Sequence, residues 1–324
     1  MKLKRRMFLP VGFFTTAVIA TRKTVARDGR AQLALVAAGK AFPFRYFSEA
    51  MKQFEWIEGQ NLSLTIHILG ADTRQRQRVA VAAVAMRPDM IVAAGVSDAL
   101  AVHSLNGSVP IVVITGTDLE HSGLVQSLRH PGGSVTGLST IGMDLDGKRL
   151  EMLRELMPTL RQAALLGNPT YPNDESRFAD ATASARSLSI VLHRRSARSA
   201  DELDTVFAAA SEAGDQAMVV PYNALTYENL PQVIALANSL RLPTAFEVRE
   251  YVEGGGLFSF GPVYRDYFKG AAALADRILK GDRPGDLPIE QPTKFELVIN
   301  RKTANALGLA LPPALLARVD EIIE

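Results

Sequence analysis

Short apolar runs alternate with longer polar segments of helical period along most of the chain. In the first half, apolar or β-branched runs at 32–37, 62–68, 90–93 and 111–114 are predicted strands. The segments between them, at 44–54, 74–86 and 97–104, are predicted helices. Regular alternation of this kind indicates βαβ units and parallel sheets.

The same alternation begins again in the second half. Predicted strands lie at 162–166, 190–193, 217–220 and 244–246, and predicted helices at 175–187, 200–210 and 227–240. A turn-rich break at 129–134 separates the halves, followed by a short strand at 135–138 and a helix from Gly147. Asp144 and Asp146 precede or open that helix, where they are interpreted as caps rather than as an acid–base pair.

The repeated pattern predicts an α/β protein with two doubly wound parallel-sheet lobes. Ligands of such sheets bind outside the carboxyl ends of the strands. If the two lobes face each other, the cleft between them is the expected site.

The first 26 residues have a different composition from the rest. They hold six basic residues, no acidic ones and an apolar stretch at 8–20 that is too short to span a bilayer. Arg5 and Arg6 stand before Phe8 and Leu9, as in a twin-arginine export signal, and a peptidase could cut after Ala26. The alternatives are a frayed basic end or a single membrane anchor, but the order of the segments favours export and a periplasmic location.

Removing this leader makes the net charge of the chain negative. The whole chain has 36 basic and 34 acidic residues, and loss of six basic ones leaves 30 against 34, a net charge of about −4. The sequence pI of 8.8 therefore gives no support to a nucleic-acid-binding surface. The absence of cysteine excludes disulfides, a cysteine nucleophile, thiolate metal sites and a lipidated cysteine anchor.

Polar residues at the predicted strand ends of the first lobe are candidate ligand contacts. They are Ser97, Thr115, Thr117 and Asp118. A hydroxyl beside a helix N-terminus suits a carboxylate, and Asp118 suits an ammonium. Ser97 and Asp118 are equally well interpreted as helix N-caps.

Equivalent positions in the second lobe are Asn168, Tyr171, Tyr222, Asn223 and Glu247. Each tyrosine follows a strand, where its ring could stack on a ligand while its hydroxyl fixes the orientation. The alternative is an aromatic residue that packs at the edge of the lobe. Phe44 and Tyr46, near the end of the first strand, favour an apolar or aromatic solute.

Several motifs follow the twin-arginine leader in a characteristic order. They are EWIEGQN (55–61), RPDMIV (87–92), HPGGSVTG (130–137), GGGLFSFGP (254–262) and QPTKFELVIN (291–300), followed by 303–309. Together they resemble the periplasmic substrate-binding proteins of bacterial ABC importers with a type I two-lobed fold. The resemblance carries Asp118 and Asn168 over as ligand contacts. It implies a non-enzymatic receptor that delivers a small solute to a permease and its ATPase. From the strand-end hydroxyls and helix amides we expect this solute to be an amino acid or small carboxylate, and we expect the receptor to be a monomer.

The resemblance also implies three chain crossings between the lobes. We therefore assign 27–141 with 256–281 to the N-terminal lobe and 142–255 with 282–324 to the C-terminal lobe. The glycines at 254–256 suit a tight crossing between lobes better than a phosphate cradle.

Other functions have less support. The five histidines have no metal-binding spacing, and the chain has no nucleophile elbow or phosphate loop, so neither a metal nor a cofactor is expected. An isomerase or hydrolase with Asp118 or Glu247 as base, or a sensory binding protein for a membrane receptor, remain alternatives. A DNA-binding regulator is disfavoured, because the leader stands where a helix-turn-helix would be.

Overall fold

The computed structural model describes residues 29–39, 43–69, 73–115, 119–120, 122–139, 145–171, 174–291 and 293–324. The leader therefore lies outside the described residues. No helix in these ranges has both the length and the hydropathy that a membrane span requires.

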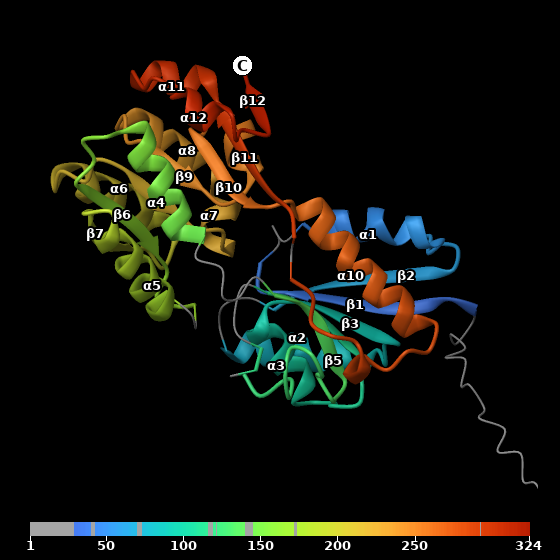
Figure 1. Cartoon of the computed structure of the whole chain (residues 1–324). Coiled ribbons are helices and arrows are strands. Elements are labelled where there is room, and N and C mark those ends of the chain that lie inside the picture. The colour runs from blue at the N-terminus through green and yellow to red at the C-terminus, as the bar shows by residue number, and fades with distance from the viewer. Residues whose placement is uncertain are drawn as a thin grey trace, which may run out of the picture.

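The first lobe is built on a five-stranded parallel sheet with the order β2-β1-β3-β4-β5. Its strands are β1 (Ala31–Ala37), β2 (Leu62–Ile68), β3 (Met90–Ala94), β4 (Ile111–Thr115) and β5 (Val135–Ser139). Its helices are α1 (Phe44–Met51), α2 (Thr73–Ala85), α3 (Val96–His103) and α10 (Tyr264–Leu279), with a 3₁₀ turn at Lys52–Phe54. Figure 1 shows α1 beside α10 on one face of the sheet, and α2 with α3 on the other.

Alternate side chains of β1 explain why both faces of this sheet are covered. Leu33 and Leu35 pack into the core under α1 and α10, whereas Ala34 and Val36 pack into the core under α2 and α3. A strand buried on both faces reads as a continuous apolar run, which is the pattern of residues 31–37.

The second lobe contains a seven-stranded sheet with the order β12-β11-β10-β9-β8-β6-β7. Its strands are β6 (Gln162–Gly167), β7 (Val191–Ser196), β8 (Met218–Val220), β9 (Thr244–Phe246), β10 (Phe258–Pro262), β11 (Phe295–Asn300) and β12 (Glu321–Ile323). Within the part of the chain that the structure describes, β10 and β11 form the one antiparallel pair of this sheet. Its helices are α4 (Leu145–Leu156), α5 (Asp174–Ser187), α6 (Leu203–Glu212), α7 (Ala224–Glu228), α8 (Leu230–Ser239), α9 (Arg249–Glu253), α11 (Arg301–Leu307) and α12 (Pro313–Leu316), with a 3₁₀ turn at Ala200–Glu202. A further 3₁₀ turn, at Pro284–Asp286, lies beside β5 of the first lobe.

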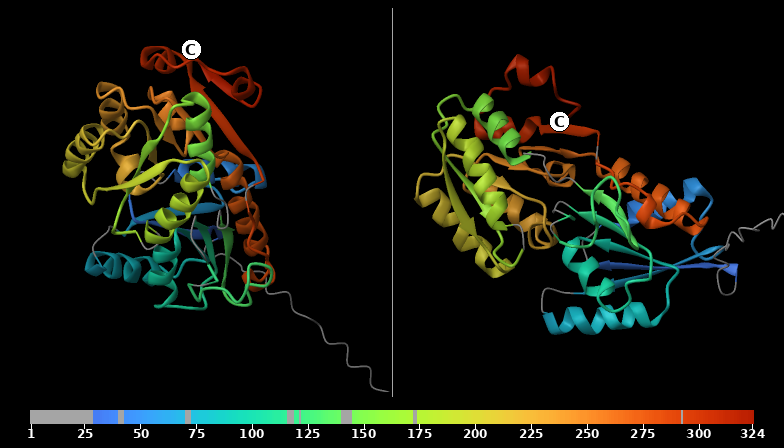
Figure 2. Two further views of the ribbon diagram at one scale, coloured as in Figure 1. Left: turned by 60° about the vertical axis from the view of Figure 1, so that its left-hand side comes forward. Right: turned by 60° about the horizontal axis from the view of Figure 1, so that its bottom comes forward.

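The chain passes between the lobes at three places: between β5 and α4, between β10 and α10, and between Glu290 and β11. Figure 2 shows the two lobes from two further sides. Few chain segments therefore constrain how one lobe turns against the other.

Two expected crossings are displaced from their predicted positions. The segment from 256 was expected in the first lobe, but β10 pairs with β9 and β11 in the second sheet. The segment from 282 was expected in the second lobe, but it lies along β5: the Thr136 hydroxyl donates to the Leu287 carbonyl (2.8 Å), and the Glu290 N–H donates to the Gly137 carbonyl (2.9 Å). Strand pairing, which residue pattern alone does not reveal, fixes both positions.

The three glycines at 254–256 do not form a crossing either. They connect α9 to β10 inside the second lobe. A Cβ at Gly256 would lie 2.6 Å from the Phe246 ring and 2.8 Å from the Tyr251 carbonyl oxygen, so close packing requires glycine there.

Candidate functional site

The two lobes touch where the carboxyl ends of their strands face each other. Gly39 follows β1, and a Cβ at this glycine would lie 2.4 Å from Glu228 Oε1 and 3.0 Å from the Ala224 Cβ of α7. The first lobe therefore contacts α7 of the second lobe at Gly39, and this contact is possible because glycine has no side chain. The strand ends of the two lobes around this contact are where the sequence predicts a ligand-binding cleft, and we call this region the cleft.

A buried carboxylate, Asp98, stands on the first-lobe side of the cleft in the first turn of α3. It is 2% exposed, and its Oδ1 lies 3.8 Å from Arg76 Nε. Burial raises the pKa of Asp98 to about 6, although the charge of Arg76 and a hydrogen bond from the Ala38 backbone favour the ionised form. Sequence reasoning selected the neighbouring Ser97, which is half-buried, and missed Asp98 because SDAL reads as the start of an amphipathic helix.

Tyr171 lies opposite, on the second lobe. Its hydroxyl oxygen accepts a hydrogen bond from the Ala224 N–H (2.8 Å). Burial is the main reason that the pKa of Tyr171 is raised, and the charges of Asp98 and Glu228 raise it further. The predicted residue Tyr171 is thus within electrostatic range of an acidic group on the other lobe.

The side chains of Asn168 and Asn223 form hydrogen bonds with neighbouring residues of their own loops. Asn168 Oδ1 accepts hydrogen bonds from the backbone N–H and the hydroxyl of Thr170. Asn223 caps α7, because its side chain accepts from the Thr226 N–H while the Thr226 hydroxyl accepts from the Asn223 N–H. Both residues lie at strand ends as predicted, and their side-chain oxygens shape the loops around the cleft.

Glu247 belongs to an ion network of four residues, in which Asp146 and Arg149 are buried and Glu247 and Arg177 are partly exposed. Arg177 bridges Glu247 (3.0 Å) and Asp146 (2.5 Å), and Arg149 bonds Asp146 (2.5 Å) and lies 3.7 Å from Glu247. The two arginines hold the pKa of Asp146 at about 2 despite its burial. The Tyr222 N–H also donates to Glu247 (3.2 Å).

This network corrects two sequence-based interpretations. Asp146 was expected to cap a helix from Gly147, but α4 begins at Leu145 and Asp146 pairs with Arg149 and Arg177 instead. Asp144 lies outside the described residues. Glu247 was considered as a base, but its Oε2 already accepts from Arg177 and from the Tyr222 N–H, which favours a positioning role for it. The arginines were missed because α4, α5 and the end of β9 meet only in the folded chain.

Tyr222 contributes to an aromatic row that passes from one lobe to the other. Its ring centroid lies 5.1 Å from that of Tyr227 and 5.3 Å from that of Tyr264, the first residue of α10. The row continues from Tyr264 to Phe268 (6.2 Å) and from Phe268 to Tyr46 (6.0 Å). Tyr222 therefore packs within this row, and its contact with a ligand stays a prediction.

The remaining predicted residues of the first lobe are Thr115, Thr117 and Asp118. Thr115 ends β4 and is buried, and its carbonyl accepts a hydrogen bond from the Tyr267 hydroxyl (3.1 Å). Thr117 and Asp118 lie outside the described residues. Thr115 therefore links the end of β4 to α10.

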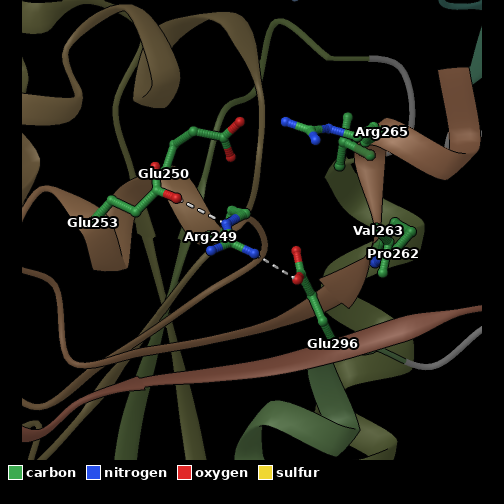
Figure 3. A pocket seen from close by; sticks show the side chains of 8 residues that line it. Arg249, Glu250, Glu253, Pro262, Val263, Arg265 and Glu296 are labelled. Carbon is green, nitrogen blue, oxygen red and sulfur yellow. Dashed lines mark hydrogen bonds and ion pairs between the residues drawn. The ribbon is translucent and has the colours of Figure 1, made fainter. Parts of the chain in front are cut away.

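A cavity of about 350 Å³ opens between the lobes near the crossing from β10 to α10 (Figure 3). We call it the hinge cavity. Its lining residues are Arg249, Glu250, Glu253, Pro262, Val263, Tyr264, Arg265 and Glu296. None of the residues predicted from the sequence as ligand contacts lines it.

A profile of the family described as ABC transporter substrate binding protein matches residues 45–323. A protein named tyrosine-binding protein, from Clostridioides difficile (strain R20291), is 25% identical over 263 residues, or 81% of this chain and 75% of that protein.

Two solved structures share the fold over nearly the whole chain. One is a conserved domain protein from Vibrio cholerae O1 biovar El Tor strain N16961, with a TM-score of 0.83, 25% identity, and coverage of 90% of this chain and 99% of that one. The other is an ABC domain from Streptococcus pneumoniae in complex with L-Trp, with a TM-score of 0.82, 20% identity, and coverage of 91% and 100%. These structures have the two-lobed α/β fold predicted from the strand pattern.

Proposed function

The chain belongs to the ABC transporter substrate binding protein family, and from this premise we propose that it captures an amino acid or a related small carboxylate between its two lobes. In this proposal, the protein is a periplasmic receptor exported by its N-terminal leader. It acts as a monomer and hands its ligand to a permease that an ATPase drives. It binds no nucleic acid and releases its ligand chemically unchanged.

The observation that carries the proposal is the contact between lobes at their strand ends. Gly39 of the first lobe lies against Ala224 and Glu228 of α7 in the second, and the Tyr171 hydroxyl accepts a hydrogen bond from the first residue of that helix. A ligand held there would contact both lobes and would stabilise their closed arrangement by those contacts alone.

An aromatic amino acid is the favoured ligand. The aromatic row beside the cleft supplies ring surfaces, and aromatic pairs add stability beyond the area that they bury. The names of two similar proteins point the same way, since one is called tyrosine-binding and the other was solved with L-Trp. Asp98 offers a counter-charge for the ligand ammonium.

The test is a thermal-shift screen of the chain from Arg27 onward, after unfolding and refolding to remove any co-purified ligand. The screen covers the L-amino acids, small organic acids, sugars and nucleosides. A ligand at one hundred times its dissociation constant should add about 2.7 kcal/mol to the free energy of unfolding.

We expect a dose-dependent rise with L-tyrosine, L-tryptophan or L-phenylalanine, and recovery of the compound unchanged. A rise with sugars or nucleosides alone would contradict the ligand class. Conversion of the compound would favour an enzyme that uses the same cleft.

A further inference from the structure

The hinge cavity is lined by none of the residues that the sequence predicts as ligand contacts, shares Tyr264 with the aromatic row, and has walls from both lobes. Glu250 and Glu253 come from α9 and Glu296 from β11, both on the seven-stranded sheet, whereas Arg265 lies in the first turn of α10 on the five-stranded sheet. A volume of about 350 Å³ is within the range of small-molecule pockets, which is roughly 300–1,000 Å³.

One of the two arginines in the lining is already neutralised. Arg249 forms ion pairs with Glu253 (2.8 Å), Glu296 (3.0 Å) and Glu321 (2.7 Å). Figure 3 shows the first two of these pairs along one side of the cavity. This side therefore carries an excess of negative charge and offers no free cation to a ligand.

Arg265 and Glu250 extend toward each other from opposite sides of the cavity (Figure 3). Arg265 lies over the Tyr46 ring, 6.0 Å from its centroid, and forms no ion pair with any residue that the structure describes. Glu250 accepts a hydrogen bond from the Tyr46 hydroxyl at Oε1 (3.1 Å), and its Oε2 has no hydrogen-bond or ion-pair partner among the residues that the structure describes. A cation and an anion thus face the same space without meeting.

We propose that the hinge cavity is a second binding site, for a free α-amino acid with an apolar side chain. The ammonium pairs with Glu250, on the side with excess negative charge, and the carboxylate pairs with Arg265, whose planar guanidinium suits bidentate bonding. Pro262, Val263 and Tyr264 line the same cavity and give the side chain an apolar wall.

A ligand with only one charge would satisfy only one of these groups. An amine would leave Arg265 unpaired. A carboxylate would leave Glu250 unpaired, and its negative charge would also be repelled by the glutamates near Arg249. The order of affinity that follows is zwitterion first, amine second and carboxylate last. Because the walls come from both lobes, occupancy also couples to the lobe arrangement that the cleft requires.

The test is isothermal titration of the full-length mature chain with L-leucine, isoamylamine and 4-methylpentanoate. These three probes share one side chain and differ only in their charged groups. The variants are Arg265→Gln and Glu250→Gln. The matched controls are Arg283→Gln and Asp286→Asn, an exposed pair (3.9 Å) outside the cavity lining.

We expect each cavity variant to weaken L-leucine binding roughly tenfold or more, because each loses a charge-assisted interaction with the ligand. Both control variants should bind L-leucine as tightly as the unmodified chain. Arg265→Gln should also abolish the preference for L-leucine over isoamylamine, and Glu250→Gln the preference over 4-methylpentanoate. These changes in selectivity identify which group each residue holds.

Three results would overturn the proposal. In the first, L-leucine does not bind the unmodified chain. In the second, L-leucine binds the unmodified chain and all variants with the same affinity, which would place its site in the cleft. In the third case, a cavity variant weakens all three probes by the same factor, so that Arg265 and Glu250 act on lobe closure rather than on a ligand. None of these results depends on which compound binds the cleft.

Discussion

The rings of Tyr222 and Tyr264 lie 5.3 Å apart, centroid to centroid, and come from opposite lobes. Tyr222 follows β8 of the second lobe, and Tyr264 begins α10, which covers the first. Tyr264 packs against the hydrophobic cores of both lobes. A single side chain beside the second crossing therefore belongs to the packing of both halves.

Truncation of Tyr264 should destabilise the protein and loosen the contact between lobes. Tyr264→Ala removes ring contacts to Tyr222, Tyr267 and Phe268, and we expect it to cost about 3 kcal/mol of the free energy of unfolding. Tyr264→Phe keeps the ring and should cost less than about 1 kcal/mol. Urea denaturation of both variants measures the difference, and equal losses would show that the hydroxyl, not the ring, makes the contact.

The sequence allowed the fold to be predicted where burial leaves a local pattern. Continuous apolar runs such as 31–37 belong to strands covered on both faces, so their positions follow from the sequence. The lobe to which the strand Phe258–Pro262 belongs does not follow from the sequence, because an apolar strand fits either sheet equally well. Its lobe is decided by pairing with β9 and β11.

The candidate site was predicted in part for the same reason. Strand ends are visible in the sequence, so Tyr171, Tyr222 and Glu247 lie where the alternation placed them. The partners of Glu247 are Arg149 and Arg177, on two other elements. Each reads alone as an ordinary charge on a helix surface, and only tertiary packing brings them together.

Asp98 should make stability fall as pH rises. Its pKa is about 6 in the folded protein against an ordinary value of 3.8, so the folded state holds the proton more tightly. Stability from this group is complete below pH 3.8 and is lost as the pH rises through 6, by about 3 kcal/mol in total. Asp98→Asn removes this dependence, so its stability relative to the unmodified protein should rise between pH 4 and pH 7.

Asp146→Asn provides the contrast of opposite sign. The pKa of Asp146 is about 2, below its ordinary value of 3.8, so its stabilisation is complete above pH 3.8 and is lost as the pH falls toward 2. Relative to the unmodified protein, Asp146→Asn should therefore be least stable above pH 4. Urea titrations at pH 3, 4, 5 and 7 separate the two variants, and parallel curves would contradict both assignments.

Removal of Arg149 should be among the most costly single changes at a charged residue. Its side chain is 0% exposed and pairs with Asp146, so Arg149→Met leaves a buried carboxylate short of a partner, at a cost of about 3–5 kcal/mol. Arg283→Met removes an arginine that is 83% exposed and pairs at 3.9 Å, and should change stability by less than about 1 kcal/mol. The comparison is made by urea denaturation at pH 7, and a small loss for Arg149→Met would mean that Arg177 alone compensates Asp146.

Gly261 should be indispensable because it lets β10 pass close to Glu247. A Cβ at this position would lie 2.0 Å from the Glu247 carbonyl oxygen, a backbone atom, so Gly261→Ala forces the strand or the cleft wall to move. We expect a loss of about 2–3 kcal/mol in stability together with weaker ligand binding in the cleft, since Glu247 positions Arg177 and the Tyr222 backbone. Gly133→Ala is the control, because a Cβ there meets no atom within 4 Å. Calorimetry of both variants, with the ligand from the thermal-shift screen, decides the matter: if Gly261→Ala retains full affinity, the position of Glu247 does not limit ligand binding.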